Sequence, residues 1–229
     1  MPDVAWSAVF LSLQVACYSV VLITIPGIAI AWLLARRRFW GKSLLEAIIH
    51  APMVLPPVVT GYFLLVVLGR KGWIGAWLDA WFGIRLSFSM AGAVLAAALI
   101  SFPLLVRSVR LAIELVDPGL EQAAATLGGT PFRIFIRITL PLAVPGLITG
   151  MTLAFARSLG EFGATIMFAG NIAGETQTIP LALYSSMQTP GREGEVMVLA
   201  ILSLVLSMGA LLFSEWYAQR MKARIRGRA

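Results

Sequence analysis

The sequence predicts an all-α membrane protein that crosses the bilayer about five times and carries one long cytoplasmic loop. Three observations support this fold class. The composition is strongly apolar, the apolar residues form long uninterrupted runs, and most Lys and Arg residues lie between those runs. Of 229 residues, 59% are hydrophobic and 13% charged, and the mean hydropathy is +0.87. Soluble domains carry about a quarter charged residues, so a water-exposed globule is excluded.

Five apolar runs have about the 20 residues that a helix needs to cross the hydrocarbon core. Each is predicted to be helical, because the hydrocarbon offers no hydrogen-bond partner to a free backbone amide. The runs cover residues 8–34, 48–68, 90–113, 141–169 and 196–217. We expect one transmembrane domain over residues 1–229, and we disfavour an additional membrane-embedded segment within 171–190. A sixth crossing there would put the cationic loops on both sides of the membrane.

The net charge of +7 is concentrated in three regions that alternate onto one side of a membrane crossed five times. These regions carry Arg36, Arg37, Arg38 and Lys42; Arg107, Arg110, Arg133 and Arg137; and Arg220, Lys222, Arg224, Arg226 and Arg228. The opposite side carries Arg70, Lys71, Arg85 and Arg192. Cytoplasmic loops are rich in Lys and Arg, so we expect the N-terminus outside a bacterial plasma membrane and the C-terminus in the cytoplasm. The same distribution argues against a nucleic-acid partner.

Several apparent chemical motifs are incomplete. The segment Gly41-Lys42-Ser43 resembles the end of a phosphate loop, but Arg36 stands where that motif needs its first Gly. His50, the only histidine, lies four residues after Glu46, and we expect these two side chains to form a structural pair. The single cysteine, Cys17, excludes an intramolecular disulfide. We therefore predict no catalytic residue, no metal ligand and no cofactor.

The connection at 114–140 carries the clearest signals for a short helix on the cytoplasmic side. Asp117 suits an N-cap, Pro118 the first helical position, and Gly128 a left-handed stop. A second short helix is expected to begin at Pro131, giving a helix–turn–helix at the membrane surface. From these residues alone, the loop is either an interfacial connector or a surface that a partner protein grips.

The spacing in this connection resembles the Glu-Ala-Ala loop of permease subunits in bacterial binding-protein-dependent ABC importers. The matching positions are Ala123, Ala124, Gly128, Ile138, Leu140 and Pro141. Gln122 stands where the motif has Glu, and Glu121 lies one place earlier. The resemblance implies that the short helix inserts into a cytoplasmic ATPase subunit. It assigns the coupling role to Glu121, Gln122, Ala123, Ala124 and Gly128.

Further segments, at 50–62, 101–104, 154–165 and 175–180, look like those of molybdate permease subunits. The resemblance implies a fold similar to type I ABC importer permeases, and a homodimer in membrane lipid. Its implied partners are ATPase subunits, where ATP is hydrolysed, and an external oxyanion-binding protein. The implied substrate is molybdate, with tungstate as a close analogue, and a sulfate or thiosulfate permease is the main alternative. A stand-alone secondary carrier and a membrane-embedded enzyme are less favoured alternatives.

The candidate translocation pathway lies where Pro and Gly interrupt the apolar runs. Its predicted residues are Pro56, Pro57, Thr60, Arg157, Ser158 and Glu161. The Pro and Gly residues suit either close helix packing or pathway walls that move, and both interpretations stay open. Arg157 and Glu161 lie four residues apart within one predicted helix, so they should share a face. They are either a structural pair or a charge-balanced part of an anion pathway.

Overall fold

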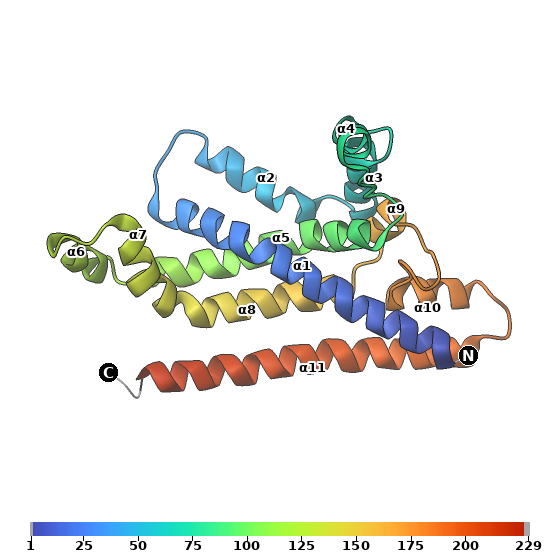
Figure 1. Ribbon diagram of the computed structural model, residues 1–229. Coiled ribbons are helices and arrows are strands. Elements are labelled where there is room, and N and C mark those ends of the chain that lie inside the picture. The colour runs from blue at the N-terminus through green and yellow to red at the C-terminus, as the bar shows by residue number, and fades with distance from the viewer. Residues whose placement is uncertain (1, 227–229) are drawn as a thin grey trace.

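The computed structural model describes residues 2–226, and every regular element in this range is helical. In chain order the elements are α1 (Pro2–Arg36), α2 (Lys42–Val54), α3 (Pro57–Leu68), α4 (Trp73–Phe82), α5 (Met90–Glu114), α6 (Pro118–Thr126), α7 (Pro131–Ile134), the π turn η1 (Phe135–Thr139), α8 (Leu140–Leu159), α9 (Gly163–Phe168), α10 (Ile179–Met187) and α11 (Glu193–Arg226). Figure 1 shows α1, α5, α8 and α11 along one common long direction. The N-terminus lies at one end of this bundle, and α6 and the end of α11 lie at the other.

Four helical segments are long and apolar enough to cross a membrane, and a fifth crossing is available if a bent helix pair counts as one span. The four are Ala5–Arg36, Met90–Glu114, Pro131–Leu159 and Glu193–Phe213. The pair is α2 with α3. Within 171–190, α10 has nine residues, far fewer than the about 20 that a crossing needs.

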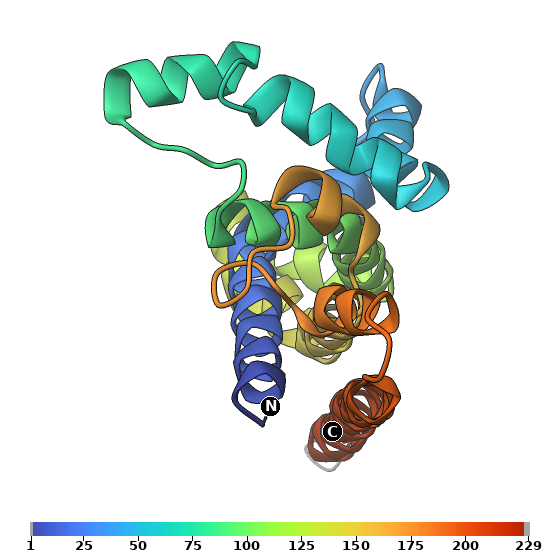
Figure 2. The same cartoon turned by 90° about the vertical axis from the view of Figure 1, so that its right-hand side faces the viewer.

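The sequence suggested one helix for the second apolar run, but the structure shows two. The helices α2 and α3 meet at an angle of 115°, with an extended Leu55 and the N-cap residue Pro56 between them. Proline disfavours the helical conformation of the residue before it and has no N–H to continue a helical ladder. Two consecutive prolines, Pro56 and Pro57, therefore break the run. Figure 2 shows α3 and α4 lying across the long direction of the bundle.

The fourth apolar run also differs from the expectation of a helix over 141–169. A continuous helical segment runs from Pro131 through η1 to Leu159, and the chain then breaks before α9. The helix predicted to begin at Pro131 is thus confirmed, but it is the start of a membrane-length segment and not a separate surface helix. The π turn ends two residues before Pro141, which cannot donate a helical hydrogen bond.

The core lies where α5 packs between α1 and α8. Its buried side chains include Leu34, Leu105, Val109, Ile113, Ala143 and Ala154. Gly146 and Gly150 of α8 allow this close approach, because a Cβ at Gly146 would lie 2.2 Å from that of Ala112. Small residues at this contact hold α8, and the helical segment before it, firmly against α5.

Candidate coupling and translocation sites

The short helix α6 has the ends that its sequence predicts. The Asp117 carboxylate accepts a 2.8 Å hydrogen bond from the backbone N–H of Gly119, and Pro118 occupies the first helical position. Gly128 follows the helix with φ +83°, in the left-handed region. No atom lies within 4 Å of a Cβ built at Gly128, so the backbone conformation, and not crowding, favours glycine there.

Large apolar side chains are exposed on the surface formed by α6, the turn after it and α7. Leu127 is 89% exposed and Phe132 70% exposed, although both are large hydrophobic residues. Gln122 and Ala123 are also exposed, whereas Ala124 is partly buried. Figure 1 shows α6 and α7 together at the end of the bundle away from the N-terminus. Leu127 and Phe132 were not among the predicted site residues, because their exposure depends on tertiary structure.

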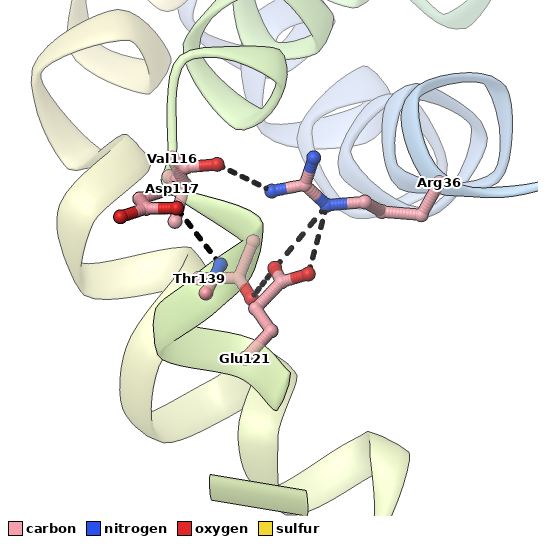
Figure 3. Close-up of polar contacts among 6 residues, drawn as sticks. Arg36, Val116, Asp117, Glu121 and Thr139 are labelled. Carbon is pink, nitrogen blue, oxygen red and sulfur yellow. Dashed lines mark hydrogen bonds and ion pairs between the residues drawn. The ribbon is translucent and has the colours of Figure 1, made fainter. Parts of the chain in front are cut away.

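Glu121 points in the opposite direction, into the protein (Figure 3). Thr139 donates its hydroxyl to Oε1 of Glu121 at 2.6 Å, and the two Glu121 oxygens lie 3.2 and 3.1 Å from Nε of Arg36. Arg36 also donates from Nη2 to the carbonyl of Val116 at 2.9 Å. One carboxylate therefore connects the last residue of α1, the first turn of α6 and the end of η1.

Burial makes this three-residue network stronger than a surface ion pair. The Arg36 and Glu121 side chains are 17% and 20% exposed, and Thr139 is 1% exposed. Hydrogen bonds to charged groups contribute about 1.5–3 kcal/mol each. The sequence indicated Glu121 but not its partners. In the sequence, Arg36 is indistinguishable from the other cations that flank the apolar runs. A π turn that ends at Thr139 has no simple sequence signal.

The predicted pairing of Glu46 with His50 is not present. Glu46 instead lies 2.8 Å from Nη1 of Arg110 on α5, and Nδ1 of His50 has no hydrogen-bond partner among the described residues. The reason is that α2 packs against α5, which brings a cation to Glu46. Among residues 2–226, no group of three His, Cys, Asp or Glu side chains could hold a metal ion.

The charged pair Arg157 and Glu161 is formed, but not on one helix face. α8 ends at Leu159, so Glu161 lies in the break before α9. Its Oε2 is 2.8 Å from Nη1 of Arg157, a close ion pair without hydrogen-bond alignment. Its Oε1 accepts a 2.9 Å hydrogen bond from the backbone N–H of Ala164. Glu161 is 2% exposed, whereas the Arg157 side chain is 35% exposed.

Arg157 faces a small cavity of about 150 Å³ at the break between α2 and α3. The lining residues are Pro52, Met53, Leu55, Pro57, Ile100, Leu104 and Arg157. The structure thus brings together two predicted pathway residues, Pro57 and Arg157, from segments about a hundred positions apart in the chain. Arg157 is the only charged side chain in this lining.

Two of the remaining predicted pathway residues, Thr60 and Ser158, are buried, whereas Pro56 at the break is exposed. Ser158 is 4% exposed and donates a 3.2 Å hydrogen bond to the hydroxyl of Ser101 on α5. Thr60 is also 4% exposed, and its hydroxyl has no hydrogen-bond partner among the described residues. At Gly163, an added Cβ would lie 2.9 Å from Pro57, so α3 and α9 meet closely. Glu161, Arg157 and the break between α2 and α3 therefore lie in one region of the protein.

The fold thus combines membrane-length helices with a capped, exposed short helix at one end and a bent helix pair that breaks one span. Residues 27–223 match the family described as the binding-protein-dependent transport system inner membrane component, and the chain belongs to that family. It is 57% identical over 225 residues to the molybdenum transport system permease protein ModB of Escherichia coli (strain K12), covering 98% of both chains. It is 38% identical over 202 residues to the sulfate transport system permease protein CysW of Synechocystis sp. (strain PCC 6803), covering 87% of this chain and 73% of that one.

The fold also matches a chain in the crystal structure of a bacterial alginate ABC transporter, with a TM-score of 0.74. That match covers 94% of this chain and 78% of the other at 17% identity, so it concerns the fold alone. The comparisons confirm the predicted family and the multi-pass permease fold. They also confirm the prediction that the chain is a transport subunit of the inner membrane and not an enzyme.

Proposed function

We propose that this chain forms the membrane pathway of an ATP-driven importer of a tetrahedral oxyanion, molybdate, with tungstate as a competing analogue. The support is the 57% identity to a molybdenum permease over 98% of both chains. The lower, 38% identity to a sulfate permease makes sulfate the second candidate. The family description adds that such systems depend on a binding protein.

The proposed assembly places two copies of this chain in the membrane, two ATPase subunits on the cytoplasmic side and an oxyanion-binding protein outside. In this assembly the N-terminus is external and the C-terminus cytoplasmic. The cationic residues near α6, such as Arg36 and Arg133, support this orientation through their position at one end of the bundle. The connection at 114–140 is then cytoplasmic and belongs to the single transmembrane domain.

The observation that carries the coupling role is the division of α6 into an outward and an inward face. The outward face, with Gln122, Ala123 and the exposed Leu127, is the surface that an ATPase cleft would grip. The inward face holds Glu121, which contacts Arg36 and Thr139. A displacement of α6 by the ATPase would therefore be transmitted to α1 and α8 through Glu121. Ala124 and Gly128 maintain the helix and its stop.

The proposed pathway runs past the cavity at Arg157, beside the break made by Pro56 and Pro57. Arg157 offsets the negative charge of the passing anion, while Glu161 prevents the site from binding a dianion too tightly to release it. Thr60 and Ser158 support the walls near this break. Because the α2–α3 junction is not part of a continuous helix, it is a suitable place for alternating access.

The test is whether an ATPase subunit co-purifies with this chain in detergent, and which oxyanion-loaded binding protein stimulates its ATP hydrolysis. We expect co-purification and stimulation by molybdate. Stimulation by sulfate alone would reject molybdate but keep the ATP-driven permease. A chain that transports without any ATPase would be a secondary carrier, and the proposal would fail.

A further inference from the structure

Three of the four cations predicted on the side opposite α6 surround one hollow of about 590 Å³. Its lining residues are Leu65, Val66, Gly69, Arg70, Lys71, Gly72, Arg85, Ser87 and Phe88. The cations come from both sides of α4, in the turn before it and the segment after it. Figure 1 shows α4, the helix that these cations flank in the chain, in the half of the molecule nearer the N-terminus and away from α6.

The hollow keeps a positive charge despite one nearby carboxylate. Asp79 lies 3.0 Å from Nε of Arg85 and 3.2 Å from Nε of Arg70. The hydrogen bond from Arg85 is the main reason that the pKa of Asp79 is below its usual value, so this carboxylate is ionised at neutral pH. Lys71 has no ion pair among the described residues. Three cations and one anion leave a local charge of about +2.

The helix α4, which begins directly after the lining residue Gly72, has the features of a membrane-interface helix. Trp73, Trp77 and Trp81 recur every four residues on one face of α4, and they are 89%, 53% and 75% exposed. Exposed Trp side chains gather at the boundary between lipid and water. The cations that flank α4 in the chain are therefore held at headgroup level, where both aqueous anions and lipid phosphates occur.

Membrane topology does not explain this cluster. Lys and Arg are depleted from external loops, so three of them around one hollow are unexpected where anchoring is the only need. The fourth cation on this side, Arg192, lies outside the hollow and has its own partner, Glu195, at 3.4 Å. A local charge of about +2 matches a tetrahedral dianion, and the Asp79 carboxylate keeps the site from holding it irreversibly.

We propose that Arg70, Lys71 and Arg85 form a binding site for a tetrahedral oxyanion at the outer end of the permease. The ligand is either the transported anion on its way to Arg157 or the phosphate of an anionic lipid headgroup. The first source rests on the proposed function, whereas the second does not. In both cases the site attracts its ligand by charge, and the apolar residues Leu65, Val66 and Phe88 form part of its wall.

The test uses the permease–ATPase complex in nanodiscs, without the external binding protein, and radiolabelled molybdate as the probe. One set of nanodiscs contains phosphatidylcholine and the other adds phosphatidylglycerol. The variant is Lys71→Glu, because Lys71 has no ion pair whose loss would disturb the fold. Lys71→Gln is the milder second variant, and Arg192→Gln is the matched control on the same side. ATPase co-purification reports whether each variant is folded.

In phosphatidylcholine we expect Lys71→Glu to weaken molybdate binding about tenfold and Lys71→Gln by less, as charge reversal beside a dianion predicts. Arg192→Gln should bind like the wild type. If phosphatidylglycerol is retained by the wild type, excludes molybdate and is lost in Lys71→Glu, the oxyanion is a lipid phosphate. If molybdate and phosphatidylglycerol each bind equally well to the wild type and to both Lys71 variants, the proposed site is wrong. That result would leave the proposed function intact as long as the wild type shows ATP-driven uptake. Absence of ATP-driven uptake by the wild type would instead reject the proposed function, but not the site.

Discussion

The hydroxyl of Thr139 donates a 2.6 Å hydrogen bond to Glu121, which ties the first turn of α6 to the π turn that leads into α8. The same carboxylate lies 3.1 Å from Nε of Arg36 at the end of α1. A negative charge in the first turn of a helix is also favoured by the helix dipole. Glu121 therefore fixes α6 to two long helices, while the neighbouring Gln122 remains exposed.

This relationship predicts that Glu121→Gln uncouples the permease without releasing the ATPase. Glutamine keeps the shape but loses the charge that Arg36 and Thr139 contact, at a cost of about 1.5–3 kcal/mol. We expect near-normal ATPase association and fewer anions transported per ATP hydrolysed. The measurement is the ratio of uptake to hydrolysis in proteoliposomes.

Two controls define the role of Glu121. Gln122→Arg, on the exposed face, should weaken ATPase association and leave the ratio of uptake to ATP hydrolysis unchanged. The double variant Arg36→Gln with Glu121→Gln should be no worse than the more impaired single variant, because both remove the same contact. Fully additive defects would show that Arg36 and Glu121 act independently.

Gly128 should be needed for its backbone conformation and for its place on the docking surface. Its φ of +83° strains a residue with a Cβ by about 1 kcal/mol or more. We expect Gly128→Ala to reduce uptake moderately, and Gly128→Asp to insert normally but to lose ATPase association and transport. ATPase co-purification and uptake measure these effects.

Gly41 provides a matched control for Gly128. It has φ +89° and, like Gly128, no atom within 4 Å of an added Cβ. Gly41→Ala therefore introduces the same type of strain in a different loop. If it weakens ATPase association as much as Gly128→Ala does, the effect is general instability and the docking role of Gly128 is wrong.

Arg157 should matter for transport through its charge. Exchanging Arg157 and Glu161 does not isolate this role, because Glu161 also accepts the N–H of Ala164 and an arginine cannot. We expect Arg157→Gln to reduce molybdate uptake about tenfold, comparable to the loss of one partly buried charge contact. Arg157→Lys should restore a substantial part, and Glu161→Gln should keep the contact to Ala164. Normal uptake by a folded Arg157→Gln protein contradicts a pathway role.

Cysteine labelling tests the orientation. In a Cys17→Ser background, single cysteines at Ser43 and Thr130 should react only from the cytoplasm, and one at Gln188 only from outside. All three positions are exposed, so reagent access is not limiting. Reaction of the Thr130 cysteine from outside contradicts a cytoplasmic position for α6.

The sequence predicted features that depend on near neighbours. The cap at Asp117, the stop at Gly128 and the long apolar helices all follow from local chemistry. The contact between Arg36 and Glu121 joins residues 85 positions apart and depends on how α1 packs, which no local pattern encodes. For the same reason Glu46 is found with Arg110 and not with His50. The proline pair signalled a bend, but its size of 115° depends on the packing of α3 against α9.

The most direct test of the account is uptake of radiolabelled molybdate by proteoliposomes that contain this chain, its ATPase and the external binding protein. The account predicts uptake with ATP, none with a non-hydrolysable ATP analogue, and stronger inhibition by tungstate than by phosphate. Molybdate uptake that proceeds equally without ATP, or ATP hydrolysis that never moves an oxyanion, would contradict it.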